Sequence, residues 1–171
     1  MIMMNDVLSV KRLAAADTVL GLGMGGFFDG ILFHQLLQLH NMMTARLPKT
    51  TIPNIEVNMF WDGLFHAATW TLTLVGLFML WNAVRDRGTL LDTRSFVGSL
   101  LLGWGLFNLI EGLIDHQLLG IHHVVENASN HLPADLAFLA SGVVLIVIGW
   151  GMIRRAERVA PAALRRQMAH T

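Results

Sequence analysis

Cysteine is absent from the 171-residue chain, and charged residues make up only 14% of it. Without cysteine the chain can form no disulfide, thiolate nucleophile, iron–sulfur cluster or cysteine-ligated zinc site. Soluble domains carry about 25% charged residues. The low charge, together with 54% hydrophobic residues, therefore indicates a membrane protein. The formal net charge is zero, which gives no electrostatic basis for binding nucleic acid.

Four apolar segments are each long enough to cross a bilayer, for which roughly 20 residues suffice. We therefore expect an all-α integral membrane protein with four transmembrane helices in a bundle. The predicted spans run from about Asp17 to His40, from Asn58 to Val84, from Ser95 to His122, and from Pro133 to Ile153. The transmembrane domain then covers 16–153, between an N-terminal segment (1–15) and a basic tail (154–171). Glycines four residues apart in the first span, at 21, 25, 26 and 30, predict close helix packing.

The distribution of lysine and arginine predicts the topology. Ten of the twelve basic residues lie in the two tails or in the charged turn at 85–94, and only Arg46 and Lys49 lie in the other two loops. The positive-inside rule places both termini in the cytoplasm and the loops after spans one and three outside. The expected location is the inner (cytoplasmic) membrane, with the lipid bilayer as partner and a homo-oligomer as a further expectation.

One motif occurs twice. Residues 29–40 read DGILFHQLLQLH and residues 111–122 read EGLIDHQLLGIH, so six of twelve positions are identical at an offset of 82. This repeat predicts an internal duplication, in which 16–84 and 95–153 form two hairpins related by an axis near the membrane normal. A repeat that keeps an acid and two histidines within an apolar run is hard to explain by packing alone.

Histidines and acids gather on the predicted outer side. Seven of the eight histidines lie between positions 34 and 131. Imidazole and carboxylate ligands without thiolate suit Zn²⁺, Fe²⁺, Mn²⁺ or Cu²⁺ better than Cu⁺. The candidate metal ligands are Asp29, His34, Asp62, His66, Glu111, His116, His122, His131 and Asp135. The candidate second-shell or entry residues are Gln35, His40, Asp115, Gln117 and His123.

Regular helix geometry adds three expectations. The deep acids Asp29 and Glu111 precede the last histidine of each motif by 11 residues, which places them about 16 Å deeper, near mid-bilayer. His34 and His116 lie five residues after the acids and about 140° around the helix. Acid and histidine could then bind one ion only if the helix is locally overwound or bulged. A shared centre also requires the two acids to face each other across the axis.

The motif pair DGxxxHQxLQxH and EGxxxHQxLxxH, with WDGLFH (61–66) between them, resembles the bacterial predicted membrane proteins of the domain-of-unknown-function 2243 family. The resemblance covers roughly 17–153. It implies a four-span integral membrane protein and supplies no agreed activity. It further implies copper handling, with a respiratory oxidase or its assembly factors as partner.

The leading hypothesis is a membrane-embedded metal-binding protein with a His/carboxylate site, dinuclear if both halves contribute, toward the outer leaflet. It would act as a metal-dependent oxidoreductase or as a metal-handling protein, with iron, copper or zinc ions as cofactor. The alternatives are a b-type haem protein with His34 and His116 as axial ligands, a copper-handling oxidase-assembly factor, a zinc intramembrane hydrolase, and a proton or ion pathway. The sequence leaves the choice among them, and whether the chain is an enzyme, open.

Overall fold

The computed structural model describes residues 2–85 and 92–168, and side chains from 11 to 158 within these ranges. The helices, in chain order, are α1 (Ile2–Asp29), the π-helix η1 (Gly30–Leu36), α2 (Ile52–Arg85), α3 (Thr93–Glu111), the π-helix η2 (Gly112–Leu118) and α4 (Leu132–Met168). The described residues contain no strand, and the predicted all-α class is confirmed. Most of the charged turn predicted at 85–94 lies outside the described residues.

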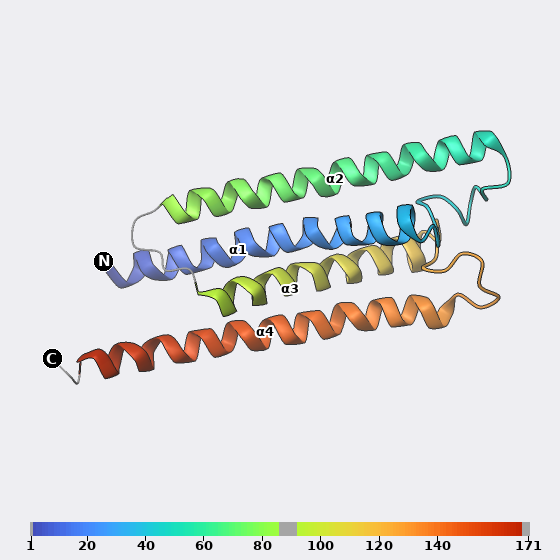
Figure 1. Ribbon diagram of the computed structural model, residues 1–171. Coiled ribbons are helices and arrows are strands. Elements are labelled where there is room, and N and C mark those ends of the chain that lie inside the picture. Colours follow the sequence, from blue (N-terminus) through green and yellow to red (C-terminus); the bar gives the residue numbers. More distant parts are fainter. Residues whose placement is uncertain (1, 86–91, 169–171) are drawn as a thin grey trace.

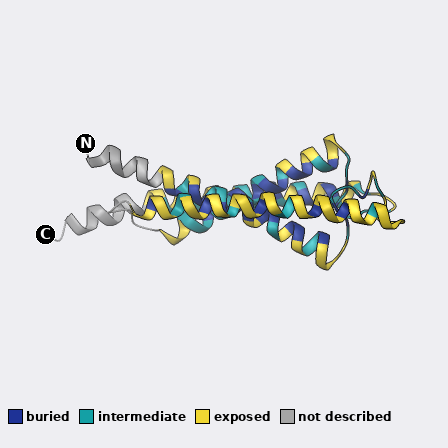
Figure 2. Cartoon of the chain, turned by 90° about the horizontal axis from the view of Figure 1, so that it is seen from above, coloured by how far each residue is buried: buried dark blue, intermediate teal, exposed yellow. Residues whose placement is uncertain are grey.

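The four long helices form a row in the order α2, α1, α3, α4 (Figure 1). Among the described residues, α1 and α3 pack against each other, α2 packs on the α1 side, and α4 packs on the α3 side. Seen from above, the helices cross, and buried residues concentrate around the crossing (Figure 2). The start of α1 and the end of α4 lie at the same end of the long helices (Figure 1). The first loop (37–51) and the second loop (119–131) lie together at the other end.

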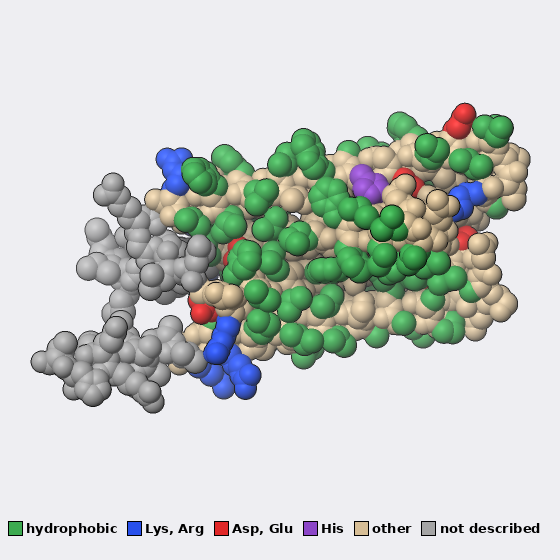
Figure 3. Space-filling model, in the orientation of Figure 1, with side chains coloured by type: hydrophobic (Ala, Val, Ile, Leu, Met, Phe, Trp, Pro, Cys, Tyr) green, Lys and Arg blue, Asp and Glu red, His purple; other side chains and the backbone are tan. Residues whose placement is uncertain are grey.

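Four helical stretches are long and apolar enough to cross a membrane: Lys11–Leu36, Ile52–Arg85, Thr93–Leu118 and Leu132–Arg158. The most apolar parts of the two central stretches are 50% and 44% buried, against 11% and 17% for the outer two. Hydrophobic side chains cover the middle of the face shown in Figure 3. The protein therefore has a central helix pair, flanked by two helices whose apolar surfaces suit contact with lipid.

Glycines bring the central helices into close contact. A Cβ atom on Gly21 would collide with the carbonyl oxygen of Leu100, and one on Gly103 would collide with that of Thr18. Both contacts link α1 to α3, and they are equivalent under the sequence repeat, since Gly21 corresponds to Gly103 and Thr18 to Leu100. Of the predicted glycine pairs, Gly25 also faces α3, whereas Gly26 and Gly30 face α2. The glycine pattern therefore serves two helix interfaces.

The substitution Gly103→Ala is expected to lower the free energy of unfolding by about 1–3 kcal/mol, because the added methyl group forces α1 away from α3. Thermal unfolding in detergent would measure the loss. Gly151→Ala is the matched control, since a Cβ atom there meets nothing within 4 Å. Equal stability of the two variants would show that the close approach of α1 and α3 is not needed.

The central helices end earlier than predicted. We expected the first and third spans to reach His40 and His122, but η1 ends at Leu36 and η2 at Leu118. Two residues later the chain adopts a left-handed conformation, with φ of 50° at Gln38 and 53° at Gly120. The backbone amide of Leu39 then donates to the backbone carbonyl of Phe33 at 2.9 Å, and the backbone amide of Ile121 donates to the backbone carbonyl of Asp115 at 3.0 Å. These bonds close the helix ends and turn each loop back over the bundle.

The two loops hold each other in place through reciprocal bonds. The His40 Nδ1 atom lies 2.9 Å from the carbonyl oxygen of Val124, and the His122 Nδ1 atom lies 3.2 Å from that of Met42. The amide of Ala45 donates to the carbonyl of Ile121 at 3.0 Å. Each loop therefore positions a histidine of the other half.

Candidate metal centre

The π-helices align each deep acid with the first histidine of its motif. A π-helix closes its hydrogen bonds over five residues, so positions i and i+5 lie above one another. His34 Nε2 lies 3.3 Å from Asp29 Oδ2, and His116 Nε2 lies 3.0 Å from Glu111 Oε1. The local bulge that the sequence required for these pairs is therefore present in both halves.

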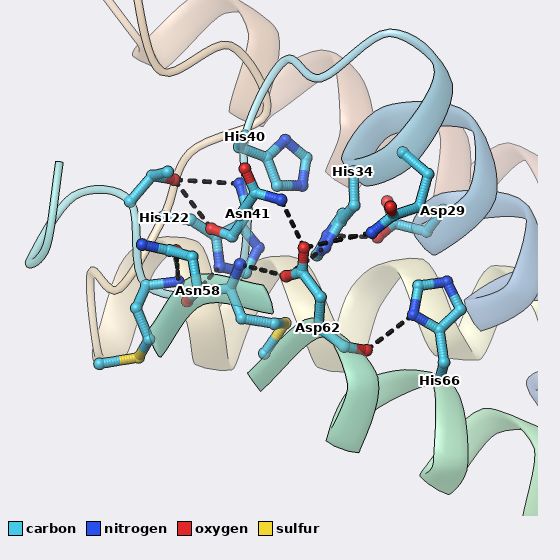
Figure 4. A network of polar contacts seen from close by, with 12 residues as sticks. Asp29, His34, His40, Asn41, Asn58, Asp62, His66 and His122 are labelled. Carbon is cyan, nitrogen blue, oxygen red and sulfur yellow. Dashed lines mark hydrogen bonds and ion pairs between the residues drawn. The ribbon is translucent and has the colours of Figure 1, made fainter. Parts of the chain in front are cut away.

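A carboxylate from the neighbouring helix faces the other ring nitrogen of each histidine. Asp62 Oδ1 on α2 lies 3.0 Å from His34 Nδ1 (Figure 4). Asp135 Oδ1 on α4 lies 3.5 Å from His116 Nδ1. Carboxylates in this position fix the tautomer and orientation of a histidine and raise its basicity. Asp62 and Asp135 thus act as orienting groups in the structure.

Backbone amides of the two loops fix these orienting acids in turn. The amide of Met42 donates to Asp62 Oδ1 at 2.8 Å, and that of Val124 donates to Asp135 Oδ1 at 3.0 Å. Met42 and Val124 occupy equivalent positions of the sequence repeat, so the two halves match at this level too. The site therefore depends on the loops as much as on the helices.

The last histidines of the motifs lie in the middle of the site. We expected His40 and His122 to lie far from the deep acids, near the outer surface, and this was wrong: His122 Nε2 is 2.7 Å from Glu111 Oε1. The expectation assumed a straight helix, whereas the chain reverses at Gln38 and Gly120. The rings of His40 and His122 stack, with centroids 4.7 Å apart and an angle of 10° between planes.

Six side chains thus converge, and we call them the inner six. They are Asp29, His34, His40, Glu111, His116 and His122, with exposed fractions between 0% and 5%. Two sets of three side chains place one ligand atom each within 4.8 Å of the others: His34, His40 and His122, and also Glu111, His116 and His122. His122 belongs to both sets, so the two candidate ion positions are adjacent.

Several ligand atoms of the inner six have no hydrogen-bond partner. They are Asp29 Oδ2, His34 Nε2, His40 Nε2, Glu111 Oε2 and both ring nitrogens of His116. A buried polar atom without a partner costs roughly 1–3 kcal/mol, and more when it is charged. Such a concentration of unpartnered donor and acceptor atoms is what a site for a bound cation requires.

His40 presents a nitrogen lone pair to this site. Burial lowers the pKa of His40 to about 2, and the neighbouring His34 and His122 lower it further. The ring is therefore neutral at physiological pH. Because its Nδ1 atom donates to the Val124 carbonyl, its unpartnered Nε2 atom is an acceptor. An imidazole nitrogen in this state is a metal ligand.

The other predicted site residues lie around the inner six. His66 Nδ1 lies 2.7 Å from the backbone carbonyl oxygen of Asp62, and its ring lies to the side of the group (Figure 4). His123 Nδ1 lies 2.7 Å from Asp135 Oδ2. Asp115 is half-buried, and Gln117 is exposed. Gln35 donates to Asp62 Oδ2 at 3.3 Å, in the position of a second-shell residue.

Two asparagines of the site were not predicted. The Asn41 amide donates to Asp62 Oδ2, and the buried Asn58 accepts from the amide of Met43 at 3.0 Å (Figure 4). An alignment of the two halves could have found them. Asn41 follows His40 as His123 follows His122, and Asn58 precedes Asp62 by the same spacing as His131 precedes Asp135.

Comparison with known proteins agrees with a membrane-spanning fold. A family model described as "Predicted membrane protein (DUF2243)" matches residues 16–156, which span all four helices. No curated protein and no solved structure gave a match. The match covers most of the chain and includes every residue of the inner six. The chain belongs to the DUF2243 family of predicted membrane proteins.

Proposed function

We propose that this membrane protein holds divalent transition-metal ions among the inner six, as a dinuclear centre to which both halves contribute. The observation that carries the proposal is the convergence of buried nitrogen and oxygen atoms that have no hydrogen-bond partner. A metal ion would be a partner for several of them at once. Imidazoles and carboxylates without thiolate favour iron, zinc or Cu²⁺ over Cu⁺.

The balance of charge supports two ions rather than one. The inner six and the two orienting acids include four carboxylates, from Asp29, Asp62, Glu111 and Asp135, all of them at most 5% exposed. An uncompensated carboxylate is costly at such a depth. Two divalent cations would neutralise all four carboxylates, whereas one would require protons or cationic histidines for the rest.

The ligand set is rigid. Rigidity favours a centre that keeps its metal ion over a site that takes up the ion and passes it on. The Nδ1 atom of each inner histidine faces an oxygen atom held by the fold: Asp62 hydrogen-bonds His34, Asp135 lies 3.5 Å from His116, and loop carbonyls bond His40 and His122. Ligands anchored in this way hold a metal in fixed geometry. We therefore infer a resident metal centre, as in a metal-dependent oxidoreductase. A metal-handling role, such as copper delivery to a respiratory oxidase, needs ready release of the ion.

The same geometry argues against haem ligation by His34 and His116. Both ring nitrogens of His34 face carboxylates, at 3.3 and 3.0 Å. His116 lies between Glu111 and Asp135 in the same way. A haem iron needs one free nitrogen of the imidazole ring, and four carboxylates are not ligands of a b-type haem.

Metal analysis of the protein, purified gently without chelator, tests the proposal. We expect about two transition-metal ions per chain, because a buried, well-formed site keeps its metal. The identity of the ion then separates redox chemistry from hydrolysis, since iron or copper supports the first and redox-inert zinc the second. Less than about 0.2 ions per chain, with none regained on reconstitution, would contradict the proposal.

A further inference from the structure

Two histidines outside the inner six stack on each other at the loop end of the second half. The ring centroids of His123 and His131 are 4.4 Å apart, with 8° between the planes. His123 Nδ1 lies 2.7 Å from Asp135 Oδ2, and His131 Nδ1 lies 3.0 Å from the Val125 carbonyl oxygen. With the Nδ1 protons donated to these oxygens, each Nε2 atom carries a lone pair.

These two rings are accessible, unlike the inner histidines. The side chain of His123 is 25% exposed, and His131 is also partly exposed. The inner four histidines are at most 3% exposed. Because the two ring planes are nearly parallel, their Nε2 lone pairs do not meet at one point, so one imidazole at a time would bind an ion here. Water would complete the coordination, which gives a weaker and more exchangeable site than the centre.

The first half has no such pair, although it makes the same structural bonds. Asn41 occupies the place of His123 and donates to Asp62, as His123 pairs with Asp135. Asn58 occupies the place of His131 and bonds the backbone of Met43, as His131 bonds that of Val125. Amides therefore suffice for the fold at these positions. The imidazoles of the second half add metal affinity, which amides lack.

One carboxylate separates the stacked pair from the centre. Asp135 Oδ2 contacts His123, while Asp135 Oδ1 lies 3.5 Å from His116 Nδ1. Asp135 itself is only 2% exposed, so it lies between a surface site and a buried one. An ion at the stacked pair is therefore one side chain away from a ligand of the inner six.

We propose that His123 and His131 form an exchangeable binding site for a divalent transition metal, through which the ion enters on its way to the inner six. This inference rests on the proposed metal centre. It assigns entry to the second half, where the stacked imidazoles face water. The first half, with Asn41 and Asn58 at the equivalent positions, offers no entry.

The rate of metal loading tests this inference. The full chain, stripped of metal in lipid nanodiscs, is mixed with Co²⁺, and the visible absorption of the bound ion is followed with time. The variant carries His123→Asn and His131→Asn, the residues that the first half uses at these positions. We expect loading of the centre to slow about tenfold or more, with the same final metal content and an unchanged thermal midpoint.

His66→Leu is the matched control. It removes another imidazole near the site, at a position where the second half has Leu139, and it should load at the wild-type rate. Loading of the double variant at the wild-type rate would overturn the entry site. So would loss of the final metal content in a folded double variant, since the pair would then be part of the centre. If the wild-type protein takes up no Co²⁺ at any rate, the proposed centre itself fails.

Discussion

Asp29→Asn and Glu111→Gln are each expected to remove most of the bound metal, and the double variant is expected to be little worse than either single one. The two acids lie on the adjacent helices α1 and α3, and the histidines that they contact, His34 and His122, have ring centroids 5.7 Å apart. Two neighbouring carboxylates in a medium of low dielectric constant cannot both be ionised unless a cation lies between them. Each acid then supports both ions, so removal of one disrupts the whole centre. Residues that act as one unit are not additive.

Metal content per folded chain is the measurement for this series. Asp17→Asn is the matched control, because Asp17 is also a buried acid on α1, with 3% exposure and one unpartnered oxygen, but lies several turns before Asp29. It should retain the wild-type metal content. If each single variant at 29 or 111 keeps about half the metal, each hairpin carries its own ion and the shared centre is wrong.

His122→Ala is expected to remove both ions, whereas His40→Ala is expected to leave one. His122 contributes a ligand atom to both sets of converging side chains, and His40 only to the set with His34. The Nε2 atom of His122 is also 2.7 Å from Glu111 Oε1, the shortest contact between an inner histidine and an acid. Because the His122 Nδ1 atom bonds the Met42 carbonyl, its Nε2 atom can bind one ion only. Loss of His122 removes that ligand, leaves Glu111 Oε1 without its closest contact and frees the loop residue Met42, whose amide holds Asp62, so both sites are disturbed. Loss of His40 leaves Glu111, His116 and His122 in place.

Metal stoichiometry, together with the thermal midpoint with and without added metal, measures this difference. A metal that binds only the folded state raises its stability, so the rise on metal addition should vanish in His122→Ala and persist, reduced, in His40→Ala. Retention of one ion by His122→Ala would show that the two sets do not share this histidine.

The fold class could be predicted because hydropathy sets the number of spans. The row of helices could not be predicted. Lipid tails are as apolar as leucine side chains, so an apolar helix face does not indicate whether it meets lipid or another helix. The glycines of α1 were a partial signal, because they marked faces that had to accept a close neighbour.

The residues that converge were mostly singled out by the sequence, with five of the inner six as candidate ligands and His40 as a candidate second-shell or entry residue, but their depth was not predicted. The leucine-rich run before His40 continues the apolar pattern of a membrane-spanning helix, so this run gives no indication that the chain reverses at Gln38. The counterpart of Gln38 is Gly120, the residue type that favours a left-handed backbone, and this difference within the repeat was the available signal. Because the reversal was missed, His40 was assigned to the periphery, whereas the structure places it at the centre.

The reciprocal bonds between the two loops also determine the order in which the parts of the site can come together during synthesis. As the chain leaves the ribosome, the first hairpin brings Asp29, His34 and Asp62 together, since all three lie before residue 85. His40, however, has its Nδ1 partner in Val124, and Asp135 arrives only with the last helix. Until α4 is inserted, the first half therefore lies in the bilayer without its bonding partners from the second half. In the centre proposed above, metal insertion would therefore be the final step of maturation, after the fourth helix has left the translocon.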